Sequence, residues 1–419
     1  MKFTHRLFRL PVAASLVLAS GIAFGQAGET VKIALIDPIS GPFANIGEAF
    51  IKVFQLEIDR MNGKGYAFNP SGVKFELVTF DNKASPQESL SALKTAIDQG
   101  IRVVAQGGSS GAALAIIDAI NKHNERNPGK EVIYLNHSAV DPDLTNSKCS
   151  FWHFRFDADT SMKMEAMGTA IKDDPSVKKI YIIGQNYSHG VQVAKFAKEV
   201  IGRKAPSVQF VGDELHPIAQ VKDFSPYVAK IKQSGADTVI TGNWGNDLAL
   251  LFKAGKDAGL NVKWYTYYAG ASGTPTAIGD AYVDKITYVY PGWINQPGDA
   301  MVLRDEFKKR YNQDITSTTV IHSMRMLAGG IAKAKSTDPV KVAKAMEGLT
   351  VKSYSGDITM RAADHQLQQT LYFVKWGKMD AKNNYNVEGT GNTFIMLKAY
   401  EPYVSSTPTS CQMKRPSAG

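Results

Sequence analysis

The sequence predicts an α/β protein made of two doubly wound, Rossmann-like lobes, and two observations support this class. Without a short N-terminal leader, the 419-residue chain is still long enough for two compact units. Short apolar segments typical of strands alternate with amphipathic segments typical of helices, and this alternation restarts after Phe151. Repeated βα units form mostly parallel sheets with helices on both faces, so two runs indicate two lobes.

The first run of βα units follows the leader directly. Its predicted strands are residues 31–36, 73–80, 103–105 and 132–135. Its predicted helices are residues 47–62 and 86–99, and a further helix after Gly111. The helix at 86–99 has Pro86 in its first turn and Gly100 just past its end, which is the usual punctuation of a helix.

The second run of βα units starts after Phe151. Its predicted strands are residues 179–183, 208–211, 238–241 and 263–267. Its predicted helices are residues 161–171, 189–201, 226–234 and 248–258. Beyond Ile286 the pattern is more helical, with helices at 299–310, at 319–334 and from Pro339 to Gly348, then extended segments at 357–360 and 371–375. The tail after Met379 is rich in turn residues, and we expect it on the surface.

The N-terminus has the pattern of a secretory signal peptide. Lys2, Arg6 and Arg9 precede an apolar run over residues 10–24, and small residues close the segment near Ala27. The run is shorter than the ~20 residues that span a bilayer. We therefore expect cleavage near Ala27 and a soluble, exported protein.

Charge and cysteine content narrow the function further. The formal net charge is +9, but the charges are mixed, and Lys308–Arg310 is the longest basic run. A nucleic-acid partner is therefore not expected. In an oxidising compartment the two cysteines, Cys149 and Cys411, favour one disulfide that ties the tail to the middle of the chain. Two free thiols or a metal site are the alternatives, although no His stands at ligand spacing.

Small polar residues follow two strands of the first run, where parallel sheets bind ligands. Gly108-Ser109-Ser110-Gly111 precedes a helix, so its N–H groups and hydroxyls could receive a carboxylate. A simple helix cap is the alternative interpretation. The segment matches neither a P-loop nor a dinucleotide fingerprint. Residues 136–140, which include Ser138 and Val140, lie in the next loop of this kind.

Aromatic residues follow strands of the second run in the same way. These strand ends carry Tyr187, Asn243, Trp244, Tyr267 and Tyr268. Any one of these aromatic rings could simply pack in a core. Their recurrence beside small polar residues instead favours an aromatic-lined pocket, and we add Phe43, in the turn after the first strand, to the candidates for ligand binding.

A search for catalytic residues finds no established pattern. The sequence has no Gly-x-Ser-x-Gly elbow, no His-Glu-x-x-His motif, and no Cys beside a His. Asp364 and His365 could form an acid–base pair, but neighbouring residues of an extended segment point to opposite sides. We therefore expect a binding protein rather than an enzyme, with no cofactor and no metal.

The mature chain resembles the Leu/Ile/Val-binding proteins, the type I periplasmic solute-binding components of branched-chain amino-acid ABC transporters. The residues that carry this resemblance are Ser40-Gly41-Pro42, Gly108-Ser109-Ser110, residues 138–145, Tyr187 with Gly190, residues 277–281, and Asp364-His365-Gln366. A subset of this family also pairs a Cys like Cys149 with one near the C-terminus. The resemblance implies a monomeric periplasmic protein that closes around a solute and is recognised by a permease.

The resemblance also implies a domain organisation. Three crossovers, expected near 154–157, 288–293 and 362–369, join the lobes. Lobe 1 would comprise 28–154 plus 291–364, and lobe 2 would comprise 155–290 plus 365–400. Residues 401–419 would form a tail tied by the disulfide, and lobe closure would be a hinge motion.

Site residues can be carried over one by one. Ser109 matches the family serine that holds the ligand carboxylate, and Ser138 and Val140 match positions that complete the carboxylate and ammonium contacts. Val140 replaces a frequent Thr, so only its backbone could serve. Tyr187 matches a pocket-wall Tyr, and Asn243-Trp244 falls where the amino-acid binders place a Tyr.

One departure concerns the ammonium anchor. The amino-acid binders have a Glu where Tyr267 or Tyr268 stands here, and a buried ammonium without a carboxylate is costly. We therefore expect a solute with a carboxylate or amide and an aromatic or flat apolar body. A branched-chain amino acid is the alternative, with the anchor supplied by Asp141, Asp157 or Asp247. A soluble partner of a membrane sensor and an exported hydrolase are the other classes considered.

Overall fold

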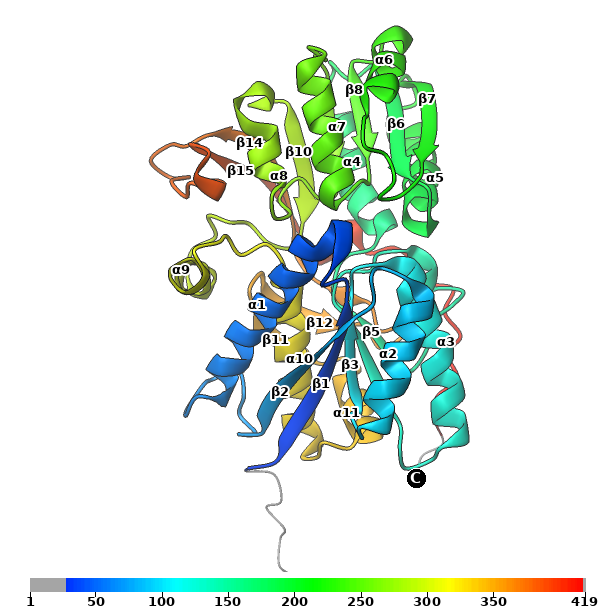
Figure 1. The fold of residues 1–419 in the computed structure, drawn as a ribbon, viewed down its shortest axis with the longest axis vertical. Helices are drawn as coiled ribbons and strands as arrows, with labels where there is room; N and C mark the ends of the chain where they lie inside the picture. Colours follow the sequence, from blue (N-terminus) through cyan, green and yellow to red (C-terminus); the bar gives the residue numbers. More distant parts are fainter. Residues whose placement is uncertain (1–27, 417–419) are drawn as a thin grey trace, which may run out of the picture.

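The computed structural model describes residues 28–416, and the predicted leader lies outside the described residues. The chain forms two α/β lobes, one above the other in Figure 1, each built around its own sheet. Within residues 28–416, no helix combines the length and apolar character that crossing a bilayer requires. The two-lobed fold class predicted from the alternation of strands and helices is confirmed.

Lobe 1 contains a parallel five-stranded sheet with strand order β2-β1-β3-β4-β5. Its strands are β1 (Thr30–Asp37), β2 (Lys74–Asp81), β3 (Val103–Gln106), β4 (Ile133–Asn136) and β5 (His153–Arg155). Ile33 of β1 is in register with Leu77 on one side and Val103 on the other. All residues of β3 and β4 are buried, because helices cover both faces of the sheet.

Two helix layers cover this sheet. The helices are α1 (Ala44–Asn62), α2 (Pro86–Asp98), α3 (Ser110–Arg126), α10 (Thr318–Ala334) and α11 (Pro339–Met346). α1 packs with α10 on one face, and α2 packs with α3 on the other (Figure 1). A small antiparallel sheet of β11 (Thr350–Ser353), β12 (Gly356–Met360) and β13 (Leu367–Gln368) joins the same core, and α9 (Asp299–Tyr311) lies against α1.

Lobe 2 repeats the strand order of lobe 1 and extends it. The order β7-β6-β8-β9-β10 corresponds to β2-β1-β3-β4-β5, and two antiparallel strands follow β10. The strands are β6 (Lys179–Gln185), β7 (Gln209–His216), β8 (Thr238–Thr241), β9 (Lys263–Thr266), β10 (Ile286–Tyr290), β14 (Leu371–Lys378) and β15 (Asn392–Tyr400).

Helices cover both faces of the second sheet as well. They are α4 (Thr160–Lys172), α5 (Ser188–Lys204), α6 (Ser225–Ser234), α7 (Gly245–Asp257), α8 (Thr274–Ile278) and α12 (Pro402–Ser405). Side chains of a strand alternate between faces, so Ile180 and Ile182 pack with α4 and α5, while Tyr181 and Ile183 pack with α6 and α7.

The prediction for the C-terminal part was partly wrong. We expected a turn-rich surface segment after Met379, but residues 392–400 form β15, which pairs with β14 along its whole length. The edge position explains the error, because residues 396–399 of this strand are exposed and its apolar alternation is weak. β10 was also missed, in the region that we expected to be helical.

The chain passes between the lobes three times: after β5, after β10 and between β13 and β14. Arg155, at the end of β5, is fully buried here and links two of these passages. Its guanidinium donates hydrogen bonds to the Gln366 side chain and the Asp141 carbonyl oxygen, and pairs with Asp159 at 2.9 Å. The residue boundaries that we assigned to the lobes stay a prediction.

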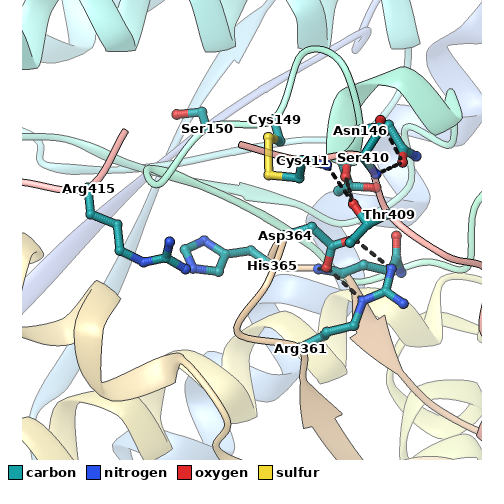
Figure 2. The surroundings of a disulfide bond; sticks show 12 residues. Asn146, Cys149, Ser150, Arg361, Asp364, His365, Thr409, Ser410, Cys411 and Arg415 are labelled. Atoms are coloured by element: carbon teal, nitrogen blue, oxygen red, sulfur yellow. Dashed lines mark hydrogen bonds and ion pairs between the residues drawn. A yellow bond between two sulfur atoms is a disulfide. The ribbon is translucent and has the colours of Figure 1, made fainter. Parts of the chain in front are cut away.

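The predicted disulfide is confirmed: Cys149 and Cys411 are bonded and are 262 residues apart in the sequence. Figure 2 shows the C-terminal tail held against lobe 1 at this bond. The Thr409 hydroxyl donates to the Thr145 carbonyl at 3.0 Å, and the Ser410 N–H donates to the Asn146 side chain at 3.0 Å. Because β15 belongs to lobe 2, the tail is a further, covalently anchored connection between the lobes.

Candidate functional site: a cavity between the lobes

The shared strand order determines where a ligand site forms. In each sheet the order reverses between two adjacent strands, β1 and β3 in lobe 1 and β6 and β8 in lobe 2. Loops diverge at the carboxyl ends of such strands and leave a crevice. The loops of both lobes line one cavity with about 1120 Å³ of space free of protein atoms, part of it open to solvent.

Eight of the ten candidate residues line this cavity. They are Ser109, Ser110, Ser138, Val140, Tyr187, Trp244, Tyr267 and Tyr268. Phe43 and Asn243 do not line it. The loops singled out in the sequence therefore meet in space, although they are far apart along the chain.

A buried carboxylate organises the lobe 1 loops. Asp37, the last residue of β1, accepts hydrogen bonds from the N–H groups of Gly107 and Gly108 and pairs with His137 at 2.9 Å. A Cβ atom on Gly108 would lie 2.8 Å from the Asp37 carboxylate, so this close approach requires glycine. The ends of β1, β3 and β4 are thereby held together beneath the cavity.

Ser109 is a helix cap, as the alternative interpretation proposed, and its role as a carboxylate receptor stays a prediction. It is the N-cap of α3, where its hydroxyl accepts from the Ala112 N–H at 3.5 Å, and it also lines the cavity. The Ser110 hydroxyl accepts from the Asp141 N–H at 3.3 Å. The N-terminus of α3 therefore points its positive dipole end toward the cavity, which suits an anionic group.

The loop after β4 presents a backbone donor. The Asn136 side chain accepts from the N–H groups of Ser138 and Ala139, at 3.3 and 2.7 Å. The Val140 carbonyl accepts from both the N–H and the hydroxyl of Thr160, at 2.9 Å each. Between residues 28 and 416, no group accepts from the Val140 N–H. This N–H and the hydroxyls of Ser109 and Ser138 form a set of neutral polar groups. The Ser138 hydroxyl also lies 3.2 Å from the His137 ring and 3.4 Å from the Thr319 hydroxyl.

Aromatic side chains form the wall contributed by lobe 2. Trp244 donates from its indole N–H to the Tyr187 hydroxyl at 2.8 Å. Phe43 of lobe 1 stacks on Trp244 with ring centroids 4.0 Å apart, so it contacts the wall from outside the cavity and bridges the lobes. Burial raises the pKa of Tyr187 and of Tyr268 above the ordinary value, so both phenols are neutral hydrogen-bonding groups.

Asn243 does not line the cavity and packs inside lobe 2. It is fully buried, and its amide bonds to the His216 ring at 2.8 Å. Its neighbour Trp244 reaches the cavity, because consecutive residues of an extended segment point in opposite directions.

Sequence reasoning missed more than half of the aromatic residues that line the cavity. Six further aromatic residues line it: Phe50, Tyr288, Tyr290, Trp293, Tyr354 and Phe394. Two come from β10 and one from β15, the strands that were not predicted. A Tyr-x-Tyr pattern at the end of a strand was the available signal for Tyr288 and Tyr290.

Of the three acids considered as an ammonium anchor, only Asp157 lines the cavity. Its carboxylate pairs with Lys163 of α4 at 2.7 Å, and both side chains are fully buried. Burial raises the pKa of Asp157, which the Lys163 ammonium opposes, and burial lowers the pKa of Lys163. Asp247 instead accepts from Gln185 and from the Ala219 N–H, and the Asp141 carboxylate accepts from the Asp143 N–H.

Asp364 and His365, the possible acid–base pair, each contact other residues in the structure. Asp364 pairs with Arg361, while His365 stacks on Phe154 with centroids 4.1 Å apart and pairs with Glu347 at 2.9 Å. These contacts give each residue a separate structural role. Across the described part of the chain, no group of three His, Cys, Asp or Glu side chains could hold a metal ion.

The structure is that of a bilobal binding protein of the type I periplasmic fold. The strand order of lobe 1 recurs in lobe 2, three passages join the lobes, and one cavity lies between them. The chain belongs to the periplasmic binding protein family, whose model matches residues 30–383, and within it to the Leu/Ile/Val-binding proteins. It is 34% identical over 421 aligned residues to "Leu/Ile/Val-binding protein homolog 4" of Brucella abortus, covering 97% of both chains.

Solved structures agree with this assignment. A leucine-, isoleucine-, valine-, threonine- and alanine-binding protein from Brucella ovis, in its closed conformation, has a TM-score of 0.82 and 32% identity. The match covers 93% of this chain and 100% of that one. An R. palustris solute-binding protein in complex with 4-hydroxybenzoate has a TM-score of 0.75 at 20% identity, over 89% and 97% of the two chains, and shares the fold.

Proposed function

We propose that this protein is an extracytoplasmic solute-binding protein that delivers a small solute to an ABC permease. The solute bears a carboxylate or amide and is of the amino-acid or aromatic-acid type. It binds between the lobes, and the permease recognises the closed form. The leader is removed near Ala27, and the mature protein acts in the periplasm as a monomer.

One observation carries the proposal: neutral donors from lobe 1 face an aromatic wall from lobe 2 across a single cavity. One donor is the Ser109 hydroxyl at the N-terminus of α3. The others are the Ser138 hydroxyl and the Val140 N–H, both in the loop after β4. Such donors suit a carboxylate, and the aromatic rings suit an apolar or flat body. The names of the relatives, as binding proteins for aliphatic amino acids or hydroxybenzoate, support the same solute classes.

A thermal-shift screen of the ligand-stripped mature protein tests the proposal. The panel contains aliphatic amino acids, aromatic carboxylates and small amides. A solute at 100 times its Kd stabilises the protein by about 2.7 kcal/mol, which is easily measured. We expect a shift with an amino acid or an aromatic acid; no shift with any member of the panel would contradict the proposal.

A further inference from the structure

Asp157 lines the cavity and has a buried carboxylate oxygen for which no hydrogen bond is found. It lies two residues beyond β5, in the first passage between the lobes, and is 1% exposed. Its Oδ2 accepts from the Lys163 ammonium at 2.7 Å. Its Oδ1 is buried and makes no hydrogen bond of good geometry with the described residues, although burial raises the pKa of this carboxyl and the adjacent Ala158 N–H contributes to lowering it. Leaving a buried acceptor unpaired is costly, so this atom calls for a donor that the protein itself does not supply.

The other acids that line the cavity are already satisfied. Asp314 accepts from Lys308 and from the Tyr385 hydroxyl, each at 2.9 Å, and from the Glu388 N–H. Glu388 accepts from the Gly273 N–H at 2.6 Å and from the N–H and hydroxyl of Thr276. Asp157 is therefore the acid of the lining that keeps a free oxygen.

The charge of the lining restricts the solute. Among the described residues that line the cavity there are three acids and no Lys, Arg or His. Behind the wall, Lys163 balances Asp157, and Arg155 balances Asp159 at 2.9 Å. A solute with only a carboxylate would add a negative charge without a counterion, whereas a zwitterion adds none.

The surroundings of Asp157 also suit a cation. The Lys163 ammonium lies 5.2 Å from the ring centroid of Tyr268 and 5.5 Å from that of Tyr290, and both rings line the cavity. Electron-rich ring faces attract cations. A solute ammonium at Oδ1 would share the Asp157 carboxylate with Lys163, close to two tyrosine rings that line the cavity.

We propose that Asp157 is the specificity-determining residue of the site: its free Oδ1 accepts a hydrogen bond from an ammonium group of the solute. This inference rests on the proposed function and narrows it to solutes that carry both a carboxylate and an ammonium. The carboxylate binds the Ser109 and Val140 end of the cavity. Asp157 thereby replaces the acid that is missing at Tyr267 and Tyr268.

Matched pairs of solutes test this inference. The ligand-stripped protein is titrated calorimetrically with L-leucine and 4-methylpentanoate, and with L-phenylalanine and 3-phenylpropionate. The twenty standard amino acids, each compared with its desamino acid, extend the series. We expect an amino acid to bind about 10- to 100-fold more tightly than its desamino counterpart, as for a hydrogen bond to a charged group.

Variants then test whether Asp157 causes the preference for an amino acid over its desamino counterpart. In Asp157→Asn the ratio of the two affinities should fall toward one. Because this change leaves Lys163 unpaired, Asp157→Asn combined with Lys163→Met serves as the charge-balanced version. Asp247→Asn is the matched control: this acid is equally buried but lies outside the cavity lining, and the ratio should stay at its wild-type value.

The outcomes separate the inference from the proposed function. If a carboxylate without an ammonium binds as tightly as its amino acid, or if Asp157→Asn keeps the wild-type ratio, the inference is wrong and the proposed function stands. If no amino acid, carboxylate or amide binds, both are wrong. The comparison of amino and desamino acids uses the wild-type protein, so equal affinities would refute the inference even if a variant does not fold.

Discussion

The stack of Phe43 on Trp244 makes a direct prediction about lobe closure. Phe43 comes from the turn before α1 in lobe 1, and Trp244 precedes α7 in lobe 2. They are 4% and 7% exposed, and their ring centroids are 4.0 Å apart. Opening the lobes would expose both rings. We therefore expect Phe43→Ala to weaken the closed form relative to the open form.

The size of this effect follows from the buried ring. Burying a Phe side chain is worth about 1.5–3 kcal/mol, and a stacked aromatic pair adds about 0.5–1.5 kcal/mol. Phe43 also packs within the core of its own lobe, so only part of this energy depends on closure. We take about 2 kcal/mol, which corresponds to an affinity loss of about 30-fold when closure is coupled to binding.

Calorimetric titration with the solute identified by the thermal-shift screen measures this loss. Phe54→Ala is the matched control, because Phe54 is fully buried in the core of the same lobe. It should lower the free energy of unfolding by about 3–5 kcal/mol and leave the affinity of the folded protein nearly unchanged. Wild-type affinity in folded Phe43→Ala would refute the role of the stack in closure.

Three further predictions concern stability and the carboxylate end of the site. Replacing Cys149 and Cys411 by Ser opens a 262-residue loop and should lower the free energy of unfolding by up to about 5 kcal/mol; an unchanged urea midpoint would contradict this. Burial lowers the pKa of His189 to about 3 from an ordinary 6.5, so the unfolded chain takes up the proton first as the pH falls. Stability should be unaffected by this group above pH 6.5 and fall by about 1.4 kcal/mol per pH unit between about pH 6 and pH 3, and urea titrations of His189→Gln should lack this slope. Ser109→Ala should cost about tenfold in affinity, whereas Ser85→Ala, at the N-cap of α2, should lose about 1 kcal/mol of stability without a change in affinity.

Sequence periodicity predicted most of the fold because buried parallel strands are short and apolar. β8 was expected at 238–241 and spans Thr238–Thr241, and α2 was expected at 86–99 and spans Pro86–Asp98. β15 was not predicted, because an edge strand is stabilised by pairing with its neighbour rather than by burial of an alternating face. The pairing of β15 with β14 is a contact of the folded state, and the local sequence pattern does not reveal it.

The candidate site was predictable where it depends on strand ends and unpredictable where it depends on side-chain direction. The loops that carry Ser109 and Tyr187 follow strands that the periodicity shows, so their meeting at the sheet edges could be expected. The opposite orientations of Asn243 and Trp244 depend on packing, in particular on the hydrogen bond of Asn243 to His216. The free oxygen of Asp157 depends on where Lys163 of α4 lies, which only the folded structure reveals.

A crystal structure of the mature protein with its identified solute tests the central claim most directly, namely that solute binds between the lobes. The account predicts one solute molecule in the cavity, with its carboxylate in hydrogen-bond distance of the Ser109 hydroxyl and the Val140 N–H, and its ammonium beside Asp157. Solute bound on the outer surface of either lobe, with the cavity between Ser109 and Trp244 left open, would contradict it.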